Sequence, residues 1–131
     1  MKQTIILGII FLSIQCQAQK NADAITGRWL SIPKEDLIIE VYKSNNQYKG
    51  KIYWIRNKNS KTKTGYLILE NLKYNSKEQI WENGKIHDPN SGRTYKAIVQ
   101  IKPDGILDVR GYLGIQFFGT NKYFKRINKK R

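Results

Sequence analysis

The chain has 131 residues, of which 24 are Lys or Arg and 10 are Asp or Glu, so its formal net charge at pH 7 is +14. This length favours a single domain with one compact core. The chain has one cysteine, Cys16, which rules out a disulfide framework within the chain.

Residues 1–18 are predicted to be a secretory signal peptide. A basic start is followed by an apolar run over 5–14 and then by small and polar residues. The run is shorter than the roughly 20 residues that span a bilayer. Cleavage is expected after Ala18, which would leave 19–131 as an exported protein, periplasmic or secreted. The alternative is a lipoprotein anchored through Cys16.

Residues 19–131 are predicted to form a single all-β domain. The expected strands are 26–31, 36–43, 48–55, 65–74, 78–87, 93–103, 106–114 and 121–127. Only 65–74 also fits a helix. Short strands joined by turns indicate a sandwich or a barrel, and hairpins between successive strands favour an antiparallel up-and-down barrel or a strongly coiled sheet.

Side-chain alternation predicts which residues share a face of the sheet. In the segment 48–55, one face is expected to carry Tyr48, Gly50, Ile52 and Trp54. In the segment 93–103, it is expected to carry Tyr95, Ala97, Val99 and Ile101. Asp104-Gly105 after the second segment is a strong hairpin signal.

The motif Gly27-Arg28-Trp29 opens the first expected strand. It resembles the G-x-W signature of lipocalins and related calycin barrels, in which the Trp closes one end of the barrel and a basic residue of the last strand lies across it. Arg126 or its neighbour Lys125 is expected to be that residue. The resemblance implies structural roles for Gly27, Trp29 and Arg126.

The segment 87–92, His-Asp-Pro-Asn-Ser-Gly, contains the only histidine of the chain and could be taken for a site. A calcium loop starting at Asp88 would need Glu at its twelfth position, where Val99 stands. His87 and Asp88 are adjacent, so they face opposite ways and cannot act as a catalytic pair unless the strand breaks there. No metal ligands and no catalytic residues are therefore expected here.

A turn explains the same segment better. Pro89 fixes φ, Gly92 allows a positive φ, and the Asp88 carboxylate can accept backbone N–H bonds. Pro89 and Gly92 are therefore assigned structural roles between the strands 78–87 and 93–103.

Taken together, these residues resemble the bacterial family called domain of unknown function 2147. The matching core is W-x-x-G-x-I-x-D-P-x-x-G-x-x-Y, supplied here by Trp81, Gly84, Ile86, Asp88, Pro89, Gly92 and Tyr95. The resemblance continues through 107–114 and includes 27–29 and the ending at 124–126, where Phe stands in place of a frequent Trp. It implies a small exported bacterial protein with a lipocalin-like barrel, and it implies no activity.

The leading functional hypothesis is a non-catalytic barrel that binds a small amphipathic or anionic ligand. The candidate ligand-binding residues are Trp54, Trp81, Asp88, Tyr95, Arg110 and Tyr112. The structural alternative is that these aromatic residues fill the core and that Arg110 faces outward. No cofactor is expected, and the chain is expected to be a monomer.

Two other functions remain open. The protein could be an envelope-associated interaction protein whose basic residues, including the runs 56–63 and 122–131, meet anionic lipid or glycan. It could also be a hydrolase that uses Asp88 with His87 or Glu70. Nucleic acid is not an expected partner, because export argues against it.

Overall fold

The structure is a computed structural model that describes residues 21–58, 62–113 and 116–127, with the backbone alone for 112, 113 and 116–121. A short 3-10 helix, η1 (Asp23–Ile25), precedes eight strands. The strands are β1 (Gly27–Ile32), β2 (Leu37–Ser44), β3 (Gln47–Ile55), β4 (Leu67–Asn75), β5 (Ile80–His87), β6 (Thr94–Ile101), β7 (Leu107–Leu113) and β8 (Gln116–Arg126).

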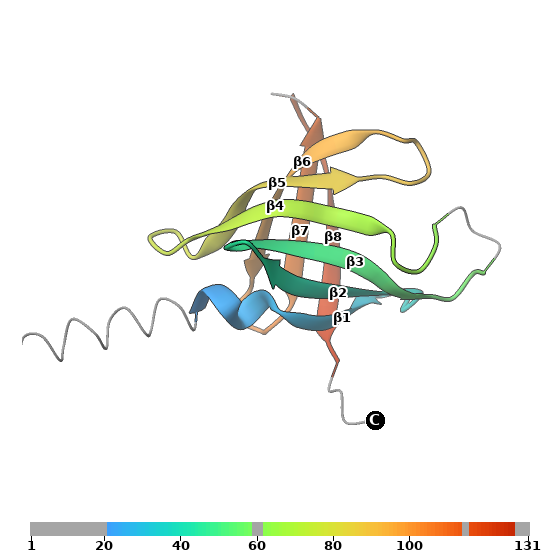
Figure 1. Cartoon of the computed structure of the whole chain (residues 1–131), viewed down its shortest axis with the longest axis horizontal. Helices are drawn as coiled ribbons and strands as arrows, with labels where there is room; N and C mark the ends of the chain where they lie inside the picture. The colour runs from blue at the N-terminus through green and yellow to red at the C-terminus, as the bar shows by residue number, and fades with distance from the viewer. Residues whose placement is uncertain (1–20, 59–61, 114–115, 128–131) are drawn as a thin grey trace, which may run out of the picture.

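The strands form one closed antiparallel barrel in chain order (Figure 1). Each strand pairs with the next, and β8 pairs with β1 through contacts such as Trp29 with Arg126. The predicted up-and-down barrel is thus confirmed, and the ambiguous segment 65–74 is largely strand. Among the described strands, closure pairs both edges of the sheet with one another.

The barrel core follows the expected alternation most clearly in β6. Ala97 is 1% exposed and Val99 is fully buried, whereas the intervening Lys96 and the flanking Thr94 are exposed. The rest of the buried hydrophobic core comes from η1 and the other strands: Ile25, Trp29, Ile39, Val41, Tyr48, Ile52, Leu69, Leu72, Trp81, Leu107, Val109 and Phe124.

The alternation predicted for β3 is wrong at Trp54. The pairing of β2 with β3 shifts between Ile38 and Ile39, which face Trp54 and Ile52 respectively. One extra residue, Tyr53, is therefore accommodated in β3 as a bulge, and the alternation is reset. Trp54 is 38% exposed on the outer face, and it does not share the interior with Ile52.

One end of the barrel is closed by η1 and by Trp29. The Trp29 ring is fully buried and its indole N–H donates to the carbonyl of Ile25 at 2.9 Å. The indole N–H of Trp81 donates to the carbonyl of Ala22 at 3.0 Å. The hydroxyl of Tyr48 donates to the carboxylate of Asp23, which ties the same helix to β3.

Arg126, and not Lys125, is the basic residue that lies on Trp29. Its guanidinium carbon is 4.1 Å from the Trp29 ring centroid, and its nitrogens donate to the carbonyls of Thr26 and Ala24 at 2.8 and 2.5 Å. Gly27 makes room for it, because a Cβ at that position would lie 2.8 Å from an Arg126 nitrogen. Gly27 also has φ of +126°, which side chains rarely allow.

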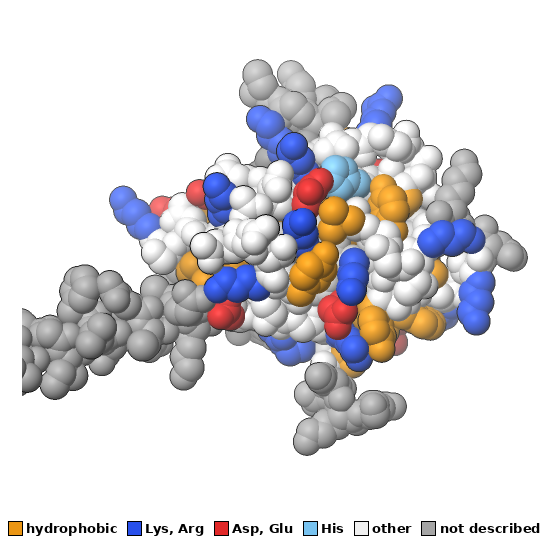
Figure 2. Space-filling view, viewed as in Figure 1, with side chains coloured by type: hydrophobic (Ala, Val, Ile, Leu, Met, Phe, Trp, Pro, Cys, Tyr) orange, Lys and Arg blue, Asp and Glu red, His pale blue; other side chains and the backbone are white. Residues whose placement is uncertain are grey.

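Charges are interspersed on one face of the outer surface. On the face shown in Figure 2, Lys and Arg side chains lie among acidic and apolar ones and do not form a separate basic patch. Arg28, for example, pairs with Glu40 at 3.2 Å and stacks on Tyr53 at 3.8 Å. Among the described residues, no helix has the length and apolar character needed to cross a membrane. The predicted signal peptide lies outside the described residues.

Candidate functional site

A cavity of about 710 Å³ opens at the barrel end opposite Trp29. This end carries the loops 33–36 and 88–93 and the described loop residues 56–58 and 62–66, which lie at the right of Figure 1, away from η1. Strand direction explains the placement, because β2, β4 and β6 begin at this end and β1, β3 and β5 finish there. The residues that close one end of the barrel therefore do not obstruct the other.

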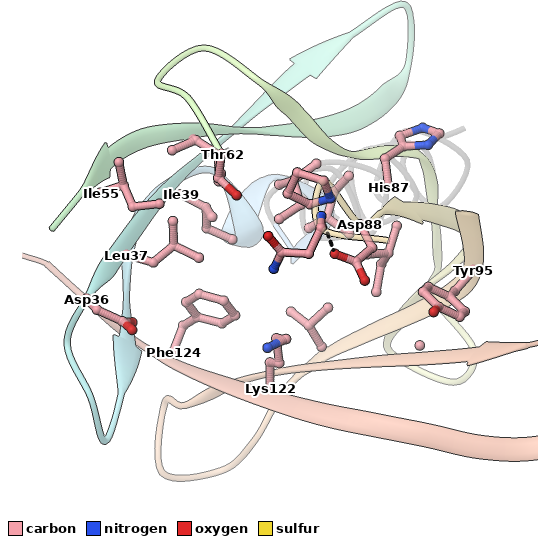
Figure 3. A pocket seen from close by; sticks show the side chains of 18 of the residues that line it. Asp36, Leu37, Ile39, Ile55, Thr62, His87, Asp88, Tyr95, Lys122 and Phe124 are labelled. Atoms are coloured by element: carbon pink, nitrogen blue, oxygen red, sulfur yellow. Dashed lines mark hydrogen bonds between the residues drawn. The ribbon is translucent and has the colours of Figure 1, made fainter. Parts of the chain in front are cut away.

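One wall of the cavity is aliphatic. It is supplied by β2, β3 and β4 through Leu37, Ile39, Ile52, Ile55, Ile68 and Leu69. Figure 3 shows Leu37, Ile39 and Ile55 together on one side of the opening. Gly50 at the base of this wall is close to Leu69, with only 3.3 Å between a Cβ placed there and the Leu69 Cβ. The packing beneath the wall is therefore tight, and the open volume lies above it.

Polar groups face this wall from β6, β8 and the loop 88–93. Asp88 and Tyr95 lie on the opposite side in Figure 3, and Lys122 extends from β8 into the space between. Lys122 points inward because it pairs with Val109, whose side chain is 4% exposed in the barrel interior. Directly paired residues of antiparallel strands face the same side of the sheet.

The Asp88 carboxylate organises the loop at the cavity mouth. One oxygen accepts the backbone N–H of Asn90 at 2.9 Å and the other accepts the Ser91 hydroxyl at 2.8 Å. The backbone N–H of Gly92, at φ of +74°, donates to the Asp88 carbonyl at 2.8 Å. Partial burial acts to raise the pKa of Asp88, but these hydrogen bonds and the charge of Lys122 outweigh it and lower the pKa below its ordinary value.

The loop 33–36 is fixed on the other side of the mouth. The Ser31 hydroxyl donates to the Asp36 carboxylate at 2.9 Å and accepts the backbone N–H groups of Asp36 and Leu37 at 3.2 and 3.1 Å. Arg56 lines the cavity as well, and its side chain donates to the carbonyl of Glu35 at 3.0 Å. The Asp36 carboxylate thus accepts a hydrogen bond from the end of β1, and the Asp88 carboxylate accepts hydrogen bonds from its own loop.

The six predicted ligand-binding residues do not form one site in the structure. Asp88 and Tyr95 line the cavity. Trp54 is on the outer face, and Trp81 is 3% exposed beside η1 at the closed end. Arg110 lies between Val109 and Gly111, which both line the cavity, so it faces outward. The side chain of the sixth, Tyr112, lies outside the described residues.

Lys122 is one of the lining residues that the sequence did not identify, since it was placed in a solvated basic tail. The alternation of side chains in the last strand could have predicted the inward position of Lys122. Arg126 was expected to lie across the interior Trp29, and residues two apart on a strand share a face. Phe124 and Lys122 had to follow Arg126 inward, and Phe124 is indeed 4% exposed.

His87 takes part in a polar chain at the outer edge of the mouth. Its Nε2 is 2.5 Å from the Glu70 carboxylate and its Nδ1 is 3.0 Å from the Thr94 hydroxyl. Carboxylate, imidazole and hydroxyl in this order are the groups of a catalytic triad, in which the imidazole takes the hydroxyl proton and the carboxylate orients the imidazole. However, Glu70 and Thr94 do not line the cavity, and the His87 ring in Figure 3 is directed away from its centre. Within the described residues, no three side chains of the metal-binding types come together.

Comparison with known proteins gives a family and a fold. The sequence profile of DUF2147, described as an uncharacterised protein conserved in bacteria, matches residues 27–126. No curated protein matches the chain. A solved structure of protein HP1028 from Helicobacter pylori, described as belonging to the lipocalin family, superposes with a TM-score of 0.63 at 16% sequence identity. The match covers 80% of this chain and 84% of that one.

The profile match spans most of the chain, including the closed end at Trp29 and Arg126 and the loop at Asp88. The match to HP1028 bears on the fold alone, and it agrees with the closed barrel of eight strands. The chain is therefore a member of the DUF2147 family of bacterial proteins and has a lipocalin-like barrel fold.

Proposed function

We propose that this barrel binds one small amphipathic molecule in the cavity at its open end. The observation that carries the proposal is the division of the lining. The strands β2, β3 and β4 contribute aliphatic side chains, and Asp88, Tyr95 and Lys122 face them across the opening. A ligand with an apolar body and a polar end would satisfy both sides at once.

The size of the cavity supports this proposal. Pockets that hold small ligands have volumes of about 300–1,000 Å³ and are mostly apolar with a few placed polar groups. The cavity of about 710 Å³ falls within that range. Burying the apolar part of a ligand against such a wall contributes about 25 cal/mol for each Å² removed from water.

The proposal is for binding without catalysis. The chain of Glu70, His87 and Thr94 contains acid–base groups, but its hydroxyl is exposed on the outer side and is not a lining residue. Substrate held in the cavity would not meet that hydroxyl. A ligand-binding role requires only the shape and polarity of the lining.

The test uses the neutral fluorescent probe N-phenyl-1-naphthylamine, titrated into the protein without detergent. We expect saturable binding of one probe per chain. Leu37→Trp places a large side chain in the aliphatic wall and should abolish binding. The matched control, Ile38→Trp, adds the same side chain at the next position, which faces outward, and should leave the affinity within about twofold.

Two results would contradict the proposal. The first is a linear, non-saturating fluorescence response of the wild-type protein. The second is equal loss of binding in Leu37→Trp and Ile38→Trp. Circular dichroism melting of both variants separates loss of the cavity from loss of the fold.

We further infer that the protein is exported and cleaved after Ala18, on the basis of the apolar run at 5–14 and the small residues that follow. Intact mass of the protein from the envelope and the medium of its own bacterium tests this. A chain beginning at residue 19 is the expected result. A mass that includes residues 1–18 would contradict it, and a diacylated chain beginning at Cys16 would identify the lipoprotein alternative.

A further inference from the structure

We propose that Lys122 anchors the ligand, and that the ligand is an amphiphile whose polar end is a small anionic group such as a carboxylate or a phosphate monoester. This inference rests on the proposed function and specifies its ligand class. The observation behind it is the placement of a lysine inside a lipocalin-like barrel, opposite an aliphatic wall.

The position of Lys122 follows from the register of β7 and β8. Leu107 pairs with Phe124, and Val109 pairs with Lys122. The side chains of Leu107, Phe124 and Val109 lie in the interior and are at most 4% exposed. Lys122 stands on the same face two residues from Phe124. Because the cavity is open above it, its side chain remains exposed to solvent in the lumen and is accessible to a ligand.

The hydrogen bonds of the two lining carboxylates indicate that the ligand's charged group is an anion. Asp36 and Asp88 are the two carboxylates of the lining. One oxygen of Asp36 accepts the Ser31 hydroxyl of β1, whereas the two oxygens of Asp88 accept the Asn90 N–H and the Ser91 hydroxyl of its own loop. Among the described residues, no carboxylate lies within salt-bridge distance of the Lys122 ammonium, although its charge is felt at Asp88. Both carboxylates thus already accept hydrogen bonds within the protein, and the Lys122 ammonium retains donors for an incoming anion.

The geometry also sets the orientation of the ligand. Lys122 projects from β8, and the aliphatic side chains of β2 to β4 lie across the opening from Asp88 and Tyr95 (Figure 3). With the anionic group on Lys122, an attached hydrocarbon tail can lie against Leu37, Ile39 and Ile55. A cationic group in the same place would be repelled by Lys122, and its nearest carboxylate, Asp88, already has both oxygens bonded.

Isothermal titration with four ligands that share one decyl tail tests the inference: decanoate, decyl phosphate, decan-1-ol and decyltrimethylammonium, each below its micelle-forming concentration. We expect at least one of the two anions to bind about tenfold more tightly than the alcohol, and the cation to bind most weakly. A charge-assisted hydrogen bond at a partly desolvated site is consistent with a tenfold effect.

Matched variants then locate the effect. Lys122→Met should reduce the affinity for the preferred anion about tenfold while the affinity for decan-1-ol changes less than about twofold. Lys122→Arg keeps the charge and should restore most of the affinity. Lys96→Met removes the same charge from the exposed outer face of β6 and should have no effect on any of the four ligands.

The outcomes distinguish this inference from the proposed function. Equal affinities for the anions, the alcohol and the cation would overturn the role of Lys122 while saturable binding of N-phenyl-1-naphthylamine still upheld the cavity. An anion preference that survives in Lys122→Met, or that is lost equally in Lys96→Met, would also overturn it. Failure of the neutral probe as well as all four ligands would overturn both.

Discussion

Asp88 both stabilises the loop 88–93 and carries a charge that interacts with Lys122 in the cavity. Its two oxygens accept from Asn90 and Ser91, and these bonds together with the Lys122 charge hold its pKa below the ordinary value despite partial burial. A lowered folded-state pKa means that the ionised form stabilises the native state. This stabilisation is present above the unfolded-state pKa of about 3.9 and is lost as the pH falls through the folded-state value.

We therefore expect Asp88→Asn to lower the free energy of unfolding by about 1 kcal/mol at pH 7, since a charged acceptor in the turn is replaced by a neutral one. The difference from wild type should shrink as the pH falls below about 4, because the carboxylate is protonated first in the unfolded state and, at lower pH, in the folded state as well. Urea unfolding of both proteins between pH 7 and pH 2.5 measures this. A difference that stays constant over the whole range would show that Asp88 acts only through its shape.

At the residue scale, the sequence anticipated the turn chemistry better than the lining of the cavity. Pro89, Gly92 and the Asp88 carboxylate could be assigned to a turn because their backbone preferences are local. Lys122 could be placed inward only through the expected contact of Arg126 with Trp29, since its own immediate sequence is typical of a solvated tail. Cavity residues depend on register across several strands, which local composition does not record.

At the scale of single strands, alternation predicted β6 correctly and failed in β3. In β6 the inward set of Tyr95, Ala97, Val99 and Ile101 runs without interruption. In β3 the bulge at Tyr53 reverses the side on which Trp54 lies. A bulge adds one residue to one strand only, and the sequence of that strand does not indicate it.

Other irregularities of the strands, unlike the bulge in β3, could have been predicted from the sequence. Asn71 in β4 and Asn83 in β5 both have positive φ, at +62° each, and the pairing of β5 with β6 shifts between Trp81 and Gly84. Asn tolerates this conformation better than most residues. An Asn within an apolar strand pattern was therefore a usable signal for a change of register.

The β3 bulge makes a spectroscopic prediction. Of the three tryptophans, Trp29 and Trp81 are at most 3% exposed and Trp54 is 38% exposed. Acrylamide should therefore quench only part of the wild-type emission, and Trp54→Phe should remove most of the quenchable part. If Trp54 instead faced the interior with Ile52, its substitution would leave the quenchable fraction unchanged.

The pairing of β1 with β8, here called the seam, closes the barrel. Arg126 contacts Trp29 across this seam and also holds the segment around η1 through the carbonyls of Ala24 and Thr26. Lys125, the next residue in β8, forms an exposed ion pair with Glu35 at 2.8 Å. The two cations are adjacent in sequence but face different surroundings.

We expect Arg126→Met to lower the free energy of unfolding by about 2 kcal/mol, because a cation–π contact and hydrogen bonds from a charged donor are lost together. Lys125→Met removes the same charge and should leave the urea midpoint unchanged within error, as is usual for exposed pairs. Equal effects of the two substitutions would indicate that net charge, and not the contact with Trp29, holds the seam.

The barrel fold could be predicted because the order of its strands in the sheet is the same as their order in the chain. Each strand pairs with its sequence neighbour, so hairpin signals such as Asp104-Gly105 nearly determine the topology. The last strand was predicted too short, as 121–127 instead of Gln116–Arg126, since glycines at 114 and 119 interrupt its pattern. The open volume could not be predicted, because it depends on how the interior side chains pack after closure.

The most direct test of the central claim, that the open end of the barrel is a ligand site, is an amide ¹H–¹⁵N NMR titration with N-phenyl-1-naphthylamine. The account predicts saturable shifts at Leu37, Ile55, Asp88 and Lys122, with the amides of Trp29 and Trp81 at the closed end unchanged. No shifts at saturating probe, or shifts confined to outward-facing residues such as Trp54 and Lys96, would contradict it.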